Sequence, residues 1–252
     1  MKILILFVCL SFFPLLAAGQ SSINIKVEYV HTVGQNEQQV TYPHYLFLSG
    51  SKSYYLIKLS QDDRPALKKV EKEDGTLHFD VVVKSPEDSG VFHDPKRGEM
   101  ISNVPLFDKM FLVEEPTPAI SWSITGNTRV IAEHECHEAL GEFRGRKYSA
   151  WFTPDIPVSA GPYKFGGLPG LILQVNEQKG GFNWYCKSIG KISSEDALIV
   201  RRPVKGESVT FHEFYDLIIT SIKRRIASME ANGNVTVGEL RVNTDEWLER
   251  IK

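Results

Sequence analysis

The chain has 252 residues and a formal net charge of −2 at pH 7, from 29 basic and 31 acidic side chains. This balance argues against a nucleic-acid-binding surface, which needs clustered Lys and Arg. Hydrophobic residues make up 42% of the sequence, enough for a sizeable core, and a β-rich fold of this length often forms a single domain.

The N-terminus has the pattern of a secretory signal peptide. Lys2 supplies a positive charge, an apolar run covers Ile3–Leu16, and small residues follow. The run is shorter than the ~20 residues of a membrane-spanning helix, and no other stretch qualifies. We therefore expect a signal peptide at residues 1–19 and a single β-rich domain at 20–252. The protein would be exported to the periplasm or outer cell envelope and would not be an integral membrane protein.

Alternation of apolar and polar residues dominates the chain and predicts β-strands, because successive side chains of a strand point to opposite faces. Gly126-Asn127 predicts a turn between two strands, and the Gly- and Pro-containing stretch 85–99 predicts a surface loop. Since short turns join strand to strand, we expect a mainly antiparallel sheet. The expected strands are residues 23–29, 42–48, 54–59, 77–83, 100–104, 107–113, 122–124, 129–139, 147–152, 171–175 and 182–192.

One helix is predicted near the C-terminus. Thr210 and Glu213 form a capping box, in which each side chain can bond an amide of the first turn. Apolar residues then recur at helical spacing, and Asn232-Gly233 is typical of a helix end. We expect this apolar stripe to pack on the sheet; its members are Phe211, Phe214, Ile218, Ile222 and Ile226.

The segment Gly161–Val175 is the most distinctive in the sequence. Gly161-Pro162 and Pro169-Gly170 are typical of tight turns, because glycine reaches φ > 0 and proline fixes φ near −65°. We expect Gly170 to adopt a positive φ, between Pro169 and the strand that follows.

Two cysteines, Cys136 and Cys186, remain after removal of the signal peptide. In an oxidising compartment two such cysteines favour a disulfide, which would close a loop of about 50 residues. The alternative is that each is a small buried hydrophobic residue. We expect a Cys136–Cys186 bridge.

Four segments together resemble one known family: Arg129–Ala139, Phe143–Arg146, Tyr148–Pro157 and Gly161–Leu173. They are similar to the GLPGLI family, exported proteins of Bacteroidota named for the hexapeptide that stands here at Gly167–Ile172. The resemblance implies a GLPGLI-type domain with no established activity and no catalytic residues. It also implies an envelope role, since members are often considered alongside TonB-dependent receptors.

The order of a cysteine strand, an aromatic strand, a proline-rich turn and an apolar strand also resembles the half-barrel of periplasmic lipoprotein carriers. We therefore expect an α+β fold, predominantly β, in which a curved antiparallel sheet, half-barrel-like, carries one packed C-terminal helix. The chain departs from the family at Glu138, where members usually have lysine. Cys186 looks like an addition, which leaves the disulfide without family support.

Possible metal ligands are densest at Glu133–Glu138. On a strand, His134 and Cys136 share one face and His137 points to the other, so the segment supplies only two ligands together. A metal- or thiol-dependent enzyme using His134, Cys136 and His137 is the alternative function, but we expect no metal and no other cofactor. We expect adjacent acids such as Glu114-Glu115 to be surface charge rather than an acid–base pair.

Aromatic residues around the Gly/Pro segment indicate a binding surface. Trp151, Tyr163 and Phe165 lie near a loop that a sheet can hold rigidly, and recognition often resides in such loops. The alternative is that these rings pack the core. We expect a non-catalytic protein that uses Trp151, Tyr163 and Phe165 to bind an apolar ligand, a peptide or an envelope protein partner. The resemblance links that partner to a TonB-dependent receptor system.

Overall fold

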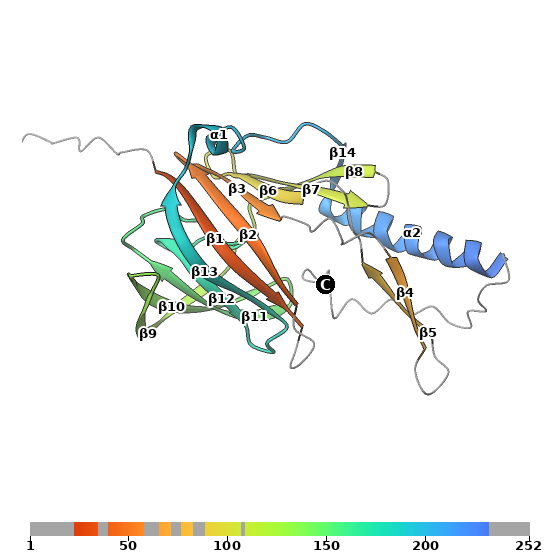
Figure 1. The fold of residues 1–252 in the computed structure, drawn as a ribbon, viewed down its shortest axis with the longest axis horizontal. Coiled ribbons are helices and arrows are strands. Elements are labelled where there is room, and N and C mark those ends of the chain that lie inside the picture. Colours follow the sequence, from red (N-terminus) through yellow and green to blue (C-terminus); the bar gives the residue numbers. More distant parts are fainter. Residues whose placement is uncertain are drawn as a thin grey trace, which may run out of the picture.

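The computed structural model describes residues 23–34, 40–57, 66–71, 77–82, 89–106 and 109–231, most of them in β-strands (Figure 1). The predicted signal peptide at 1–19 and the predicted helix end at Asn232-Gly233 lie outside these residues. The strands are β1 (Asn24–Val33), β2 (Val40–Ser49), β3 (Lys52–Ile57), β4 (Ala66–Glu71), β5 (Leu77–Val82), β6 (Ser89–Asp94), β7 (Glu99–Leu106), β8 (Lys109–Pro116), β9 (Trp122–Ile131), β10 (His134–Phe143), β11 (Arg146–Thr153), β12 (Leu171–Glu177), β13 (Phe182–Lys191) and β14 (Glu207–Thr210). The helices are α1 (Ser194–Ala197) and α2 (Phe211–Ala231).

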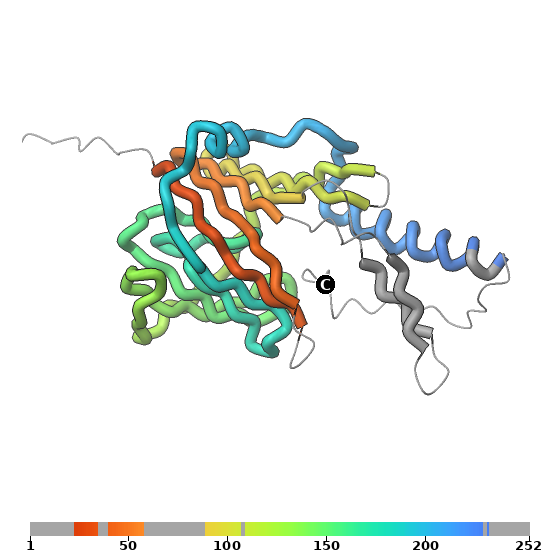
Figure 2. The backbone as a smooth tube through the Cα atoms, viewed as in Figure 1, coloured from red at the N-terminus to blue at the C-terminus, as the bar shows by residue number. Residues whose placement is uncertain are grey.

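Twelve strands form one open sheet in the order β14-β8-β7-β6-β3-β2-β1-β13-β12-β11-β10-β9. All neighbours in it are antiparallel except β14 and β8, which run parallel. β4 and β5 form a separate two-stranded pair. In Figure 2 the tube can be followed from β1 in red to α2 in blue at the far end of the molecule. The prediction of a predominantly β fold with one long C-terminal helix is confirmed.

Two local predictions are wrong. The stretch 85–99 contains β6, which pairs with β3 and β7. β9 continues through Gly126-Asn127 as a bulged strand, and the chain turns instead at Ala132-Glu133, where both residues have positive φ. The reason is Glu138: its carboxylate accepts hydrogen bonds from Asn127 and from neighbouring Thr125, which holds this stretch against β10.

The main hydrophobic core lies between the sheet and the segment that joins β11 to β12. Phe165 and Leu168 of that segment are 3% and 2% exposed. The Phe165 ring packs edge-on against Tyr148 and Trp184, with centroids 4.8 and 5.4 Å apart. Burial of each such side chain stabilises the fold by about 1.5–3 kcal/mol, so this segment is fixed to the sheet.

α2 packs on the other end of the sheet. Phe214 lies 5.6 Å from Phe111 between ring centroids, beside buried Val113. The predicted capping box is confirmed: the Thr210 amide donates to the Glu213 carboxylate at 2.7 Å, and the Glu213 amide donates to the Thr210 hydroxyl at 3.3 Å. No helix in the described part of the chain has the length and apolarity that a bilayer crossing requires.

Gly170 is essential for a different reason from the one predicted. Positive φ occurs at Gly167 and not at Gly170. At Gly170 the backbone passes so close to β11 that a Cβ would lie 2.1 Å from the Thr153 carbonyl oxygen. The residue is a glycine because of this close approach rather than because of its own dihedral angle.

The structure contains Cys136 and Cys186 as free thiols, in place of the predicted disulfide. β11 and β12 stand between their strands, β10 and β13, in the sheet. Each sulfur contacts a carbonyl oxygen of its own strand, His134 O at 3.5 Å for Cys136 and Ser188 O at 3.8 Å for Cys186. Burial raises the pKa of Cys136 to about 11 and that of Cys186 to about 12, which makes both poor nucleophiles.

Candidate functional site

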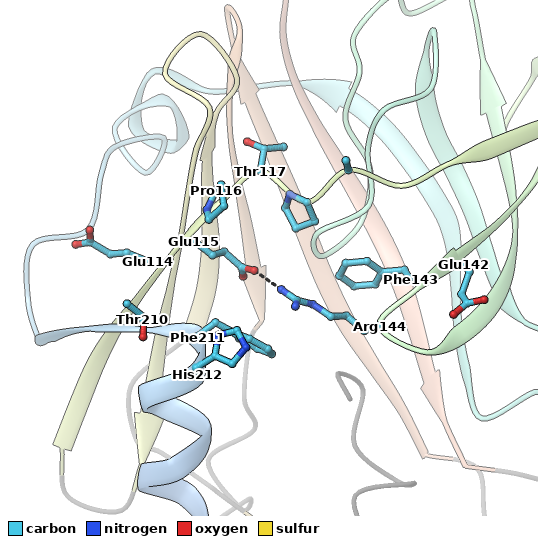
Figure 3. Close-up of a pocket in the computed structure, with 12 residues that line it drawn as sticks. Glu114, Glu115, Pro116, Thr117, Glu142, Phe143, Arg144, Thr210, Phe211 and His212 are labelled. Atoms are coloured by element: carbon cyan, nitrogen blue, oxygen red, sulfur yellow. Dashed lines mark hydrogen bonds and ion pairs between the residues drawn. The ribbon is translucent and has the colours of Figure 1, made fainter. Parts of the chain in front are cut away.

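A pocket of about 500 Å³ opens where three segments distant in sequence meet (Figure 3). The first is the end of β8 with the residues after it, the second is the β10–β11 turn, and the third is the start of α2. Phe143 and Phe211 make part of its wall apolar. We call it the Glu115 pocket; it is lined by Glu114, Glu115, Pro116, Thr117, Pro118, Ala119, Glu142, Phe143, Arg144, Thr210, Phe211 and His212.

Glu115 is the charged centre of this pocket. Its carboxylate accepts hydrogen bonds from the guanidinium of Arg144, at 2.5 Å, and from the ammonium group of Lys164. The side chains of Glu115 and Lys164 are only 5% and 2% exposed. We call these three residues the Glu115 clamp. Because they belong to β8, to the β10–β11 turn and to the β11–β12 segment, the clamp ties three parts of the chain together.

The first residue of α2 is held by the same group. The Arg144 guanidinium lies 4.1 Å from the centroid of the Phe211 ring, and the Lys164 ammonium lies 5.3 Å from it. A cation over an aromatic face is attracted by about 0.5–2 kcal/mol, more when water is excluded. The clamp therefore also fixes the start of α2 against the sheet.

Positive φ occurs at one clamp residue and directly before another. Among the described residues only four non-glycine residues have positive φ, and two of them are Arg144 at 49° and Tyr163 at 53°. This conformation costs an ordinary residue about 1–2 kcal/mol. At Arg144 it occurs in the β10–β11 turn, and at Tyr163 it directly precedes Lys164. The two-residue hairpin of Arg144 with Gly145, at φ 74°, requires this conformation at Arg144, whereas at Tyr163 it accompanies the buried Lys164 side chain.

The three predicted binding residues do not come together. Phe165 is buried in the main core. Tyr163 is half-buried. Its ring centroid lies 6.4 Å from the ring centroid of Tyr55 and 5.3 Å from the Lys164 ammonium nitrogen. Trp151 follows buried Ala150 on β11 and so faces the opposite side of the sheet from Tyr148 and Phe165. There the guanidinium of Arg129 lies 3.8 Å from its ring centroid.

The possible metal ligands are also separated. His134 Nδ1 lies 3.2 Å from Asp155 Oδ2. Cys136, two residues after His134 on β10, is buried. His137 contacts Phe152 instead, with ring centroids 5.8 Å apart. Among the described residues no three His, Cys, Asp or Glu side chains are grouped in a way that could hold a metal ion.

The clamp was not predicted from the sequence. Glu115 was expected to be surface charge, and that is wrong, because its side chain is buried. The side chain of its neighbour Glu114 is 42% exposed and forms an ion pair with Arg202 at 3.1 Å. One signal was available in Lys164, a charged residue flanked by Tyr163 and Phe165 inside a segment that otherwise reads as a rigid, packed loop. Its partner, 49 positions earlier, could not be found from the sequence alone.

Comparison with known proteins gives a partial family match. A family model described as "Protein of unknown function (Porph_ging)" matches residues 141–174, a stretch that includes Arg144, Lys164 and the Gly167–Ile172 hexapeptide. A search with the sequence matches no curated protein.

Solved structures resemble the fold. Two crystal forms of PNGF-II match with TM-scores of 0.54 and 0.56 at 14% sequence identity, over 79% of this chain and 33% of that one. The chain thus spans about a third of PNGF-II. MucB in complex with MucA(peri) matches with a TM-score of 0.31 and 12% identity, over 74% of this chain and 57% of that one. At these identities the PNGF-II likeness concerns the fold, and the MucB likeness is too low to carry an argument.

Proposed function

We propose that the protein is a non-catalytic, GLPGLI-type binding protein of the periplasm or cell envelope, and that the Glu115 pocket receives an apolar ligand or an apolar side chain of a partner. One observation carries the proposal: a pocket of about 500 Å³ is built from three separate segments, and the buried Glu115 carboxylate joins two of them to the β11–β12 segment. A volume of this size is typical of small-ligand sites.

The chemistry of the lining favours an apolar occupant. Phe143 and Phe211 present aromatic carbon, and Pro116, Pro118 and Ala119 add aliphatic carbon. Phe143 is backed by Phe165, with ring centroids 5.4 Å apart, so this wall is continuous with the main core. The charges of Glu115 and Arg144 are directed at each other, which leaves the apolar wall as the surface that gains most from contact with a ligand.

We also propose that the open sheet is curved into a half-barrel, with the pocket where its two ends approach. β8 and β9 stand ten strand spacings apart in the sheet order, or ~48 Å if the sheet were flat. Residues 117–121 are the whole link between them, and their extended reach is ~20 Å. The ion pair of Glu115 on β8 with Arg144 after β10 supports the same curvature.

The experiment is a calorimetric titration of the purified protein with palmitate as the apolar probe. We expect saturable binding at one site. Ala119→Trp, which places a large ring in the pocket, should abolish it. Val204→Trp is the matched control, because Val204 is 83% exposed and lies outside the pocket lining. Absence of saturable binding, or equal binding by Ala119→Trp and the wild type, would contradict the proposal.

A further inference from the structure

β9 is a long, exposed edge of the sheet. It stands last in the strand order, and seven of its ten residues are exposed. The opposite edge, β14, has only four residues and leads directly into α2. A strand at an edge presents a row of backbone N–H and C=O groups that can pair with another chain.

Apart from a bulge, the usual means of protecting such an edge are missing from β9. Its sequence contains neither lysine nor proline, the residues that most often prevent edge pairing. Its single charge, Arg129, is folded over the sheet, where it stacks on Trp151 and donates to the Gln174 side chain at 2.5 Å. That charge therefore does not guard the edge.

A bulge fixes the shape of this edge. Between the pairs Thr128–His137 and Ile124–Ala139, β9 contains two more residues than β10. Glu138 holds the bulge by accepting hydrogen bonds from Thr125 at 3.0 Å and Asn127 at 2.7 Å. The bulge divides the pairing of β9 with β10 into two short runs, 122–124 and 128–131, so a strand added to the free edge must follow an irregular backbone.

The edge also carries apolar side chains on one face. Ile124 pairs with Ala139 and Val130 pairs with Glu135, and these two partners lie four residues apart on β10. Ile124 and Val130 therefore point to the same face of the sheet. They are 56% and 72% exposed, although both are branched aliphatic residues suited to pack against a neighbouring strand.

We propose that β9 accepts an added strand from a partner polypeptide, an extended segment with apolar residues facing Ile124 and Val130 and with Lys or Arg near Glu133 and Glu135. Both carboxylates are exposed, Glu133 in the β9–β10 turn and Glu135 at the start of β10, directly opposite Val130. A second copy of this chain fits less well, because Arg129 is the only basic residue that its β9 would bring. The surface is distinct from the Glu115 pocket and does not depend on it.

The probe is a labelled ten-residue peptide in which valine alternates with lysine and threonine, titrated by fluorescence anisotropy. We expect saturable binding that weakens with salt, and slowed hydrogen exchange at the amides of residues 122–131. The same peptide with N-methyl groups on alternate backbone nitrogens should not bind, because it cannot form the strand ladder. Binding of both peptides alike would overturn the proposal.

Val130→Lys should weaken binding at least tenfold, because it introduces an edge lysine that repels the basic peptide. Val204→Lys is the matched control at an exposed site outside the sheet and should change binding less than twofold. Equal effects of the two, or loss of peptide binding in Ala119→Trp, would place the peptide elsewhere and overturn the proposal. The proposal would also be overturned if sedimentation showed that the wild type is a dimer and that Val130→Lys dissociates it. The strand added to β9 would then come from a second copy of this chain.

Discussion

Two regions of this molecule, the apolar core and the charged contacts at the start of α2, are held together by different forces, and we call them the apolar end and the charged end. Under the β11–β12 segment, rings such as Phe165, Tyr148 and Trp184 interlock in an apolar core. At the start of α2, the contacts to the same segment pass through a buried carboxylate between two cations. Apolar packing tolerates small changes, whereas a buried ion network depends on every member. The charged end is therefore expected to be more sensitive than the apolar end to the loss of a single side chain.

The largest expected effect is therefore at the charged end. Glu115→Gln removes the negative charge that lies between the two cations, Arg144 and Lys164, of which Lys164 is buried. This loss should lower the free energy of unfolding by about 3–5 kcal/mol. Glu114→Gln is the control, because Glu114 is 42% exposed and an exposed pair contributes about 0–1 kcal/mol. Urea unfolding measures both. Equal losses would show that the clamp is no more important than surface charge.

The apolar end should respond to volume instead. Gly170→Val places a Cβ where the Thr153 carbonyl oxygen lies only 2.1 Å away, and overpacking of this kind costs about 1–3 kcal/mol or more. Gly190→Val is the control, because no atom lies within 4 Å of the Cβ it would add. Thermal unfolding of the two variants makes the comparison. A melting temperature lowered as much by Gly190→Val as by Gly170→Val would contradict the close approach.

The apolar end also contains two buried histidines, which predict loss of stability in acid. Burial, with a smaller effect of His44, lowers the pKa of His31 to about 2, and burial lowers that of His44 to about 4. Both values lie below the 6.5 of an unfolded histidine, so the unfolded state takes up the protons first as pH falls. Stability should drop from pH 6.5 toward 4 by up to about 1.4 kcal/mol per pH unit for each histidine.

His31→Phe tests this sign, because phenylalanine can keep the stacking on Trp184, whose ring centroid is 4.4 Å from that of His31. Urea unfolding between pH 7 and 4 should show a shallower slope in the variant, by about one proton. An unchanged slope would mean that His31 does not remain neutral in the folded protein.

Local patterns predicted the elements, and long-range contacts decided the rest. Alternation located most strands, and Thr210 with Glu213 located the start of α2, because these signals depend on neighbours in sequence. The stretch at Gly126-Asn127 was misread as a turn because its conformation depends on Glu138 of the next strand. The clamp depends on contacts spanning 29 and 49 residues, so no local pattern reveals it.

The smallest expected effect compares two turns with positive φ, one at each end of β10. In the β10–β11 turn Arg144 also contributes to the clamp, whereas in the β9–β10 turn the positive φ of Ala132 and Glu133, 47° and 68°, belongs to the two-residue hairpin. Asn-Gly is the preferred pair for such a hairpin. Ala132→Asn with Glu133→Gly should therefore raise the free energy of unfolding by about 1 kcal/mol, measured in urea. Arg144→Asn relieves the same kind of strain but should lower stability, because it removes the ion pair with Glu115. If both replacements stabilise the protein equally, the strain at Arg144 is not maintained by the clamp, and the difference between the two ends of the molecule lies in packing alone.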